Sequence, residues 1–362
     1  MTTYDIAIVG AGIAGASLAA AIAPQASVVL LEAEDQPGYH ATGRSAAFWS
    51  ETYGGPAIQP LTTASGPMLR DGGFLDPLGS LHVGREEDRA RVDAFIGSFA
   101  GTPVPLDRVD PAALVPGLRA EWTLGVSEPT CAYIDVAALH AHYLALAQRG
   151  GARLLTRAAL DRAVRRDGLW HIDTPAGTVA ARILVDAAGA WADKVASRAG
   201  VSPIGIQPYR RTMVQLRTDP AAPPGLPHIA DIAGRFYFKP EAGGRLWLSP
   251  HDETATDPCD AAAEELDVAI AIDRFEQVVD WRVAAVERRW AGLRSFAPDR
   301  LPVYGFDPAT PGFFWFAGQG GFGIQTAPAA AALAAAILLD HAPPAGLDPA
   351  RYAPTRFTGR IA

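Results

Sequence analysis

Apolar and small residues form three successive blocks along the first thirty positions of the chain. Residues 4–9 are a short β-rich apolar run, residues 13–23 are rich in helix-forming alanine, and residues 27–31 are a second β-branched run. Blocks of this length and order predict a strand, a helix and a second strand. The chain therefore opens with a βαβ unit.

Two later apolar blocks predict further parts of the same sheet. Residues 182–191 read as a buried strand that ends in a small-residue turn around Gly189. Residues 313–325 read as an aromatic strand that runs into glycines, and an alanine-rich helix is expected over about 324–339. The first sheet is thus expected to be assembled from separated segments.

The segments between these blocks have a different pattern. They hold short apolar runs broken by Pro and Gly, which are typical of antiparallel sheet, and one helix is expected over 261–280. The predicted fold class is α/β, with a discontinuous Rossmann-like domain and an α+β domain whose sheet is mostly antiparallel. The first domain is expected to comprise residues 1–76, 131–206 and 300–362, and the second residues 77–130 and 207–299.

Composition and charge narrow the class of partner. The 362 residues carry a formal net charge of −8, which gives no reason to expect nucleic acid or an anionic membrane as a partner. The two cysteines, Cys131 and Cys259, have neither metal nor disulfide spacing, and we expect no metal site. We expect no secretory signal and no membrane span, and therefore a cytoplasmic protein.

The turn of the opening βαβ unit carries the most specific motif. Its glycines, Gly10, Gly12 and Gly15, have the G-x-G-x-x-G spacing, and Glu32 ends the second strand. The first glycine permits the tight turn, the second lets a pyrophosphate approach, and the third lets the helix pack on the strand. Glu32 is positioned to accept hydrogen bonds from ribose hydroxyls, so a dinucleotide without a 2′-phosphate is predicted.

Six blocks in order extend the pattern over almost the whole chain: GAGIAGAS, PGYHATGRSAA, VDAAGAW, FYFKPEAG, WAGLRSF and QGGFGIQT. In these blocks the sequence resembles the D-amino acid oxidase superfamily of FAD-dependent amine oxidoreductases. Within it, the bacterial D-amino acid dehydrogenases of the D-arginine dehydrogenase type look most similar. The resemblance implies FAD, and the absence of cysteine from these blocks favours noncovalent binding. His40 is expected to be a turn or packing residue rather than an attachment site.

The resemblance also implies which residues contact the cofactor. Arg44 would contact the phosphate or flavin region, and Ser45 and Ala46 would direct backbone N–H groups at the ring. Phe48, Trp49 and Tyr53 would begin the wall over the ring. The remaining cofactor-binding residues implied are Gly189, Gly320, Gly321, Gly323, Ile324 and Gln325, the last three through N–H groups near a helix start.

The substrate residues implied by the resemblance are two arginines and a group of aromatic residues. Arg211 and Arg294 would grip a carboxylate with two-pronged guanidinium contacts. Because Arg210 and Arg211 alternate along a strand, only one of the two can point inward. Tyr53 and Tyr237 would add hydroxyl donors, Phe48 would face the substrate side chain, and carbonyl groups around Gly321 would hold the amine.

The expected activity is oxidative deamination of a D-amino acid by hydride transfer from Cα to flavin N5. The imino acid product would hydrolyse to a 2-oxo acid and ammonia. Because a cation is costly to bury among Phe48, Trp49 and Leu81, neutral, apolar or aromatic side chains are favoured over cationic ones. A 2-hydroxy acid or a secondary amine as substrate, and a non-catalytic FAD-binding protein, are the alternatives.

The pattern does not separate an oxidase from a dehydrogenase. The electron acceptor is therefore left open between oxygen, a quinone and another carrier. Lys239, on the same strand face as Tyr237, would promote reaction with oxygen if it lay near the flavin.

Overall fold

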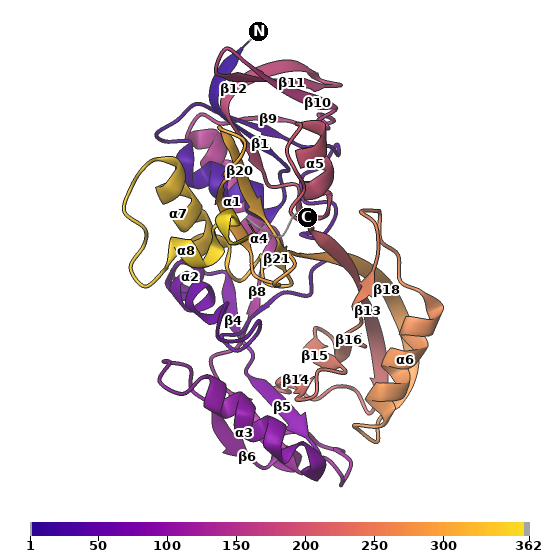
Figure 1. The fold of residues 1–362 in the computed structure, drawn as a ribbon. Helices are drawn as coiled ribbons and strands as arrows, with labels where there is room; N and C mark the ends of the chain where they lie inside the picture. The colour runs from indigo at the N-terminus through magenta and orange to yellow at the C-terminus, as the bar shows by residue number, and fades with distance from the viewer. Residues whose placement is uncertain (1, 358–362) are drawn as a thin grey trace.

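The computed structural model describes residues 2–357, which contain two large β-sheets joined by crossing segments (Figure 1). The first sheet has eight strands, five of which pair in parallel with one another. These are β1 (Thr3–Val9), β2 (Val28–Leu31), β9 (Arg153–Leu155), β12 (Gly177–Asp186) and β20 (Phe313–Ala317). Antiparallel strands complete it: β10 (Arg162–Arg166), β11 (Leu169–Thr174) and β19 (Val303–Phe306).

Both faces of the first sheet are buried because its strands are apolar on both sides. In β1, Ile6 and Ile8 point to one core, while Ala7 and Val9 point to the other. The Ile6 side is covered by α1 (Ile13–Ile22) and α7 (Ala327–Leu338), and α4 (Val136–Arg149) and α2 (Gln59–Asp71) pack alongside them. The short helix α5 (Ala192–Arg198) lies on the Ala7 side.

The second sheet has ten strands and is antiparallel except where β14 runs parallel to β5. Its two longest strands, β13 (Gln207–Asp219) and β18 (Arg282–Phe296), pair with each other. The short apolar runs of the sequence did not predict the length of these strands. The strands are β5 (Ser80–Gly84), β6 (Asp107–Val109), β7 (Leu124–Glu128), β13 (Gln207–Asp219), β14 (His228–Asp231), β15 (Tyr237–Glu241), β16 (Arg245–Ser249), β17 (Thr254–Ala255), β18 (Arg282–Phe296) and β21 (Gln319–Gly320).

A three-stranded antiparallel sheet and three further α-helices belong to the described part of the chain as well. The small sheet comprises β3 (Phe48–Trp49), β4 (Leu75–Pro77) and β8 (Ala132–Ile134). The helix expected over 261–280 is α6 (Glu265–Glu276), and α3 (Arg89–Ser98) and α8 (Pro349–Tyr352) were not predicted. Among the described residues, no helix is both long and apolar enough to cross a membrane.

The predicted α/β fold class is confirmed, with a largely parallel sheet and a mostly antiparallel one. The domain limits stay a prediction. Strand β21 joins the antiparallel sheet although its residues were assigned to the first domain. The last long helix begins at Ala327 rather than at 324, so Gly323 and Ile324 lie in the loop before it.

Candidate functional site

Residues from both large sheets line one cavity of about 580 Å³. Thirteen of the sequence-predicted residues line it: Gly10, Gly12, Glu32, Arg44, Ser45, Ala46, Gly189, Arg211, Arg294, Gly320, Gly321, Gly323 and Ile324. Gly15, Gln325, Phe48, Tyr53 and Tyr237 stand outside this lining. The structure thus gathers residues that are up to about 300 positions apart in the chain around a single space.

The glycine turn at one end of the cavity is fixed by close backbone approaches. Gly10 has φ +99°, a conformation that side chains other than glycine rarely adopt. A Cβ on Gly15 would lie 1.8 Å from the Gly10 carbonyl oxygen, so helix α1 packs against the turn only because this position is glycine. Gly12 is the N-cap of α1, and the next N–H, that of Ile13, donates to Thr42 Oγ1 at 3.0 Å.

Glu32 lies beside this turn at the end of β2. Its carboxylate accepts hydrogen bonds from the N–H groups of Ala11 (2.9 Å) and Glu34 (3.0 Å), and the residue is 8% exposed. His140 also contacts the turn, with Nε2 2.8 Å from the Ala11 carbonyl oxygen. The acid is therefore held at the cavity wall, at the distance along the chain that the motif predicts.

The segment that carries Arg44 crosses to the second sheet. The Arg44 guanidinium donates to the Ala261 carbonyl at 2.8 Å, forms an ion pair with Asp260 and lies 5.1 Å from the centroid of the Tyr39 ring. The N–H of Ser45 donates to the Thr42 carbonyl at 3.4 Å. Arg44 thus lines the cavity while its charge is already paired with a loop from the other sheet.

His40, in the same segment, has close neighbours on both sides. Its Nε2 lies 2.8 Å from Glu34 Oε1, and its ring lies 4.5 Å from the Trp191 ring, centroid to centroid. These contacts are those of a turn and packing histidine.

The glycines before helix α7 allow the closest packing around the candidate substrate region. A Cβ on Gly321 would lie 2.4 Å from the Tyr53 hydroxyl oxygen and 3.0 Å from Arg294 Nε. The side chain of Gln325 is buried beneath them, donating to the Tyr53 carbonyl at 3.1 Å and accepting from the Ser50 N–H at 3.2 Å. Gln325 therefore anchors the segment that carries Tyr53.

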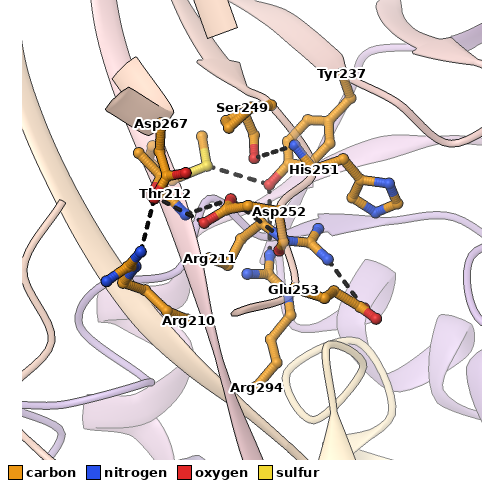
Figure 2. Close-up of polar contacts among 12 residues, drawn as sticks. Arg210, Arg211, Thr212, Tyr237, Ser249, His251, Asp252, Glu253, Asp267 and Arg294 are labelled. Atoms are coloured by element: carbon orange, nitrogen blue, oxygen red, sulfur yellow. Dashed lines mark hydrogen bonds and ion pairs between the residues drawn. The ribbon is translucent and has the colours of Figure 1, made fainter. Parts of the chain in front are cut away.

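Two arginines, the buried Arg211 and the partly buried Arg294, line the cavity, and their side chains lie close together (Figure 2). Arg211 is 1% exposed; its Nε donates to the Asp252 carbonyl at 2.6 Å, and Nη2 donates to Glu253 Oε1 at 3.1 Å. Arg294 Nη2 donates to the Tyr237 hydroxyl at 3.4 Å. Arg211 Nη1 and Arg294 Nε are buried without a hydrogen-bond partner among residues 2–357.

The choice between Arg210 and Arg211 is settled by strand alternation. Arg211 lines the cavity, whereas Arg210 points to the other face of β13 and pairs with Glu264 and with Asp267 of helix α6 (Figure 2).

The two buried guanidinium groups shift the pKa values of their neighbours. Burial and the cation of Arg294 lower the pKa of Arg211. Burial alone would lower the pKa of Arg294, but the phenol oxygens of Tyr53 and Tyr237 raise this pKa above its ordinary value. Burial would raise the pKa of Tyr53, yet Arg294 and Arg211 together lower it. Burial, with the nearby Arg211, lowers the pKa of His251 to about 3, so this histidine is neutral at pH 7.

A cluster of rings surrounds Phe48, and it differs from the expected pocket. The Phe48 ring lies 4.3 Å from His228, 5.2 Å from Tyr53 and 6.2 Å from Tyr237, centroid to centroid. The prediction that Trp49 and Leu81 share this pocket is wrong. Strand alternation sends each to another core, and Trp49 Nε1 donates to the Thr62 carbonyl at 3.0 Å.

Lys239 is buried in the second sheet, 3% exposed, and stands outside the cavity lining. Its Nζ lies 4.4 Å from the ring centroids of both Tyr133 and Trp247, and 3.6 Å from Glu241 Oε2. Burial lowers its pKa to about 8, against the opposing effect of Glu241. The role in oxygen reactivity stays a prediction.

Sequence reasoning missed several residues of this region, namely His228, His251, Asp252 and Glu253. His228 and His251 are lone histidines in a sequence without a ligand motif, and nothing in their spacing links them to Arg211. Asp252 and Glu253 read as an ordinary polar loop between two short apolar runs. One weak signal for Asp252 and Glu253 was their place in the chain. They follow β16, and β16 pairs with β13, the strand that carries Arg211.

Comparison with known proteins agrees with this geometry. The model of the family described as "FAD dependent oxidoreductase" matches residues 5–337. Glycine oxidase of Geobacillus kaustophilus is 27% identical, over 99% of this chain and 98% of its own. Its crystal structure superposes with a TM-score of 0.84 at 25% identity, covering 98% of this chain and 99% of that one.

Other similar proteins are named for activities that differ from that of glycine oxidase. Human mitochondrial dimethylglycine dehydrogenase is 26% identical over 96% of this chain, which spans 44% of that protein. The structure of L-proline dehydrogenase from P. horikoshii shares the fold, with a TM-score of 0.87 at 21% identity, covering 98% of each chain. These relatives do not single out the D-arginine dehydrogenase type, so that finer resemblance stays a prediction.

Proposed function

Because the chain belongs to the FAD dependent oxidoreductase family, we propose that it catalyses oxidative deamination of an α-amino acid. We propose further that the substrate has the D configuration and a neutral side chain. FAD, the family's noncovalently held cofactor, supplies the acceptor for the two electrons that leave the substrate. The D configuration is supported by the sequence resemblance alone.

Two features at the glycine turn suit a dinucleotide. Gly10 and Gly15 leave no room for a Cβ, so the turn is tight, and the start of helix α1 presents N–H groups suited to phosphate. We propose that Glu32 binds the adenosine ribose. We also propose that N–H groups from Gly323 to Gln325 lie at the far end of the cofactor, near its ring.

The observation that carries the proposal is the pair of N–H groups, Arg211 Nη1 and Arg294 Nε, that have no hydrogen-bond partner among residues 2–357. A buried donor that lacks a partner costs about 1–3 kcal/mol, and more when it is charged. A carboxylate placed between these two groups would satisfy both donors and offset the burial of two cations. An α-amino acid supplies such a carboxylate, and the Tyr53 and Tyr237 hydroxyls lie beside the same guanidinium.

The surrounding residues suit oxidation of a neutral amine. The two guanidinium groups disfavour a third cation nearby, so they favour loss of the proton from the bound ammonium. Carbonyl groups of the Gln319–Gly323 loop are the proposed acceptors for the amine hydrogens. No side chain is assigned as a base at Cα. The imino acid product then takes up water and yields a 2-oxo acid and ammonia.

The ring cluster around Phe48 supports neutral side chains over cationic ones. The rings nearest to Phe48 are those of His228, Tyr53 and Tyr237, and none of these three side chains is an acid. Burial lowers the pKa of His228, so it too is neutral. No acid belongs to this ring cluster, so an arginine or lysine side chain placed among the rings would be costly to bury.

A secondary amine is the second candidate substrate, and the dimethylglycine dehydrogenase relative supports it. The carboxylate grip would be the same, and only the amine contacts would differ. A 2-hydroxy acid would use the same grip as well.

The test is anaerobic reduction of the FAD-loaded protein by a panel of substrates, followed through the loss of flavin absorbance. The panel comprises D- and L-amino acids, N-methyl amino acids and 2-hydroxy acids. We expect D-Leu or D-Phe to reduce the flavin faster than D-Arg and faster than their L-enantiomers. Faster reduction by N-methyl amino acids would favour the second candidate. Bound FAD that no compound reduces would refute both proposals and favour a non-catalytic FAD-binding protein.

A further inference from the structure

One loop of the second sheet brings an acidic side chain against the proposed carboxylate grip. Residues 250–253 connect β16 to β17, and Glu253 Oε1 accepts a hydrogen bond from Arg211 Nη2 at 3.1 Å (Figure 2). The Nη1 group of the same guanidinium has no partner within the described part of the chain. Glu253 therefore lies one guanidinium away from the position proposed for the substrate carboxylate.

Glu253 is fixed in this place from its other side. Arg300 Nη2 donates to both of its carboxylate oxygens at 2.9 Å, and the Arg300 guanidinium lies 3.9 Å from the centroid of the Phe296 ring. About a third of the Glu253 side chain is exposed, at 34%. The partly exposed carboxylate is thus held between two arginines, outside the cavity lining and on the far side of the Arg211 guanidinium.

The charges in this group nearly cancel. Arg211, Arg294 and Arg300 contribute three cations, and Glu253 and Asp252 contribute two anions. Asp252 is itself held by Thr212, whose N–H and hydroxyl donate to it at 2.8 and 3.0 Å. One net positive charge remains, which a single carboxylate neutralises. A second carboxylate on the ligand would add negative charge after the first has cancelled that of the group, and Arg300 is already engaged by Glu253.

We infer that Glu253 determines specificity by restricting this site to substrates with one carboxylate, so that acidic amino acids and other dicarboxylates are excluded. The inference rests on the proposed function, because it takes Arg211 as part of the substrate grip. It adds a substrate class: amino acids whose only negative charge is the α-carboxylate. Repulsion of this kind rejects a competitor without adding any contact to the preferred ligand.

The test compares Glu253→Gln with the matched variant Glu264→Gln in the FAD-loaded protein. Glutamine keeps the shape of Glu253 and still accepts from Arg211, but it removes the charge. Glu264 pairs with Arg210 on the opposite face of the same strand, so its replacement controls for losing an arginine-paired carboxylate. Dissociation constants for acetate and for malonate are measured by calorimetry at low ionic strength.

We expect Glu253→Gln to improve binding of malonate relative to acetate by about threefold to tenfold, because one unit of nearby negative charge is lost. The gain should shrink as salt is added, since Glu253 is partly exposed. The rate of flavin reduction by D-Asp relative to D-Ala should rise in the same variant. Glu264→Gln should leave both ratios unchanged.

An unchanged malonate-to-acetate ratio in Glu253→Gln would overturn the inference, and so would an equal change in Glu264→Gln. Failure of the proposed function gives a different result. In that case the unaltered protein would hold FAD but bind neither anion, and no amino acid would reduce the flavin.

Discussion

At the scale of single residues, the site depends on which way adjacent side chains point. Arg210 and Arg211 are neighbours in a strand, yet one pairs with acids of the α6 region and the other is buried against the cavity. Strand alternation predicted that only one of them faces inward without saying which, and the resemblance implied Arg211. The answer depends on the neighbouring strand and loop, which supply Asp252 and Glu253 to Arg211.

At the same scale, His251 leads to a prediction of how the stability of the protein depends on pH. Its pKa in the folded protein, about 3, lies below its ordinary value of 6.5, so between these values the unfolded chain binds more protons. Stability from this group is therefore complete above pH 6.5 and is lost as the pH falls below it. Replacing the histidine should reduce the slope of the free energy of unfolding against pH by up to about 1.4 kcal/mol per pH unit.

His251→Asn is the suitable variant. Asparagine tolerates the φ of +55° at this position, and its side-chain N–H can replace Nδ1, which lies 2.6 Å from the Gly234 carbonyl oxygen. Denaturant unfolding at pH 7, 6 and 5 measures the slope, with exposed His341→Asn as the control. Equal slopes for the unaltered protein and His251→Asn would contradict the prediction.

At the scale of elements, local patterns predicted four of the eight strands of the first sheet, namely β1, β2, β12 and β20, and only the antiparallel character of the second sheet. The opening βαβ unit follows from the length of its apolar runs and its glycine spacing, and its strands and helix begin within a residue of the predicted positions. The second sheet was predicted as antiparallel, but the length of the β13–β18 pair was missed. Long strands interrupted by charged residues, as in Arg282–Phe296, do not stand out as apolar runs.

Substitutions of two glycines that lie inside helices test how tightly helix α1 packs against the glycine turn. Gly15→Ala in α1 would place a Cβ 1.8 Å from backbone oxygen, which cannot move aside cheaply. We expect the variant to lose about 1–3 kcal/mol of stability and to bind FAD weakly. Gly97→Ala in α3 meets no atom within 4 Å and should be neutral or slightly stabilising.

Thermal unfolding and flavin content of the purified variants measure both effects. A Gly15→Ala protein that retained full FAD content and the melting temperature of the unaltered chain would show that the glycine turn does not have the proposed role.

At the scale of the whole molecule, the cavity exists because distant segments meet. The sequence blocks indicated which residues gather around it, since the resemblance covered nearly the whole chain. The contacts that close the cavity could not be predicted, because they join loops that have no regular pattern. Arg44 is the clearest case: it lines the cavity, and its guanidinium also pairs with Asp260 of the loop that precedes α6, a contact that no sequence pattern indicated. Its contact with the cofactor stays a prediction.

This contact should slow the release of FAD. Tyr39 also donates to Asp260, at 3.3 Å, so three residues connect the two sides of the cavity. Because 59% of the Asp260 side chain is exposed, the effect of Asp260→Asn should be modest, with FAD released about twofold to fivefold faster. Flavin fluorescence after dilution measures the rate. Asp257→Asn, an exposed change in the same loop, should have no effect, and equal rates in both variants would count against a closing contact.

The most direct test of the central claim is the catalytic efficiency of Arg294→Met, measured with the fastest substrate of the amino acid panel. Arg210→Met is the control, because this arginine lies on the other face of β13. With FAD still bound in both, we predict that kcat/KM falls at least about tenfold in Arg294→Met, equivalent to about 1.4 kcal/mol. The control should stay within about threefold. Arg294→Met that keeps the efficiency of the control would contradict the assignment of the two buried guanidinium groups as the carboxylate grip.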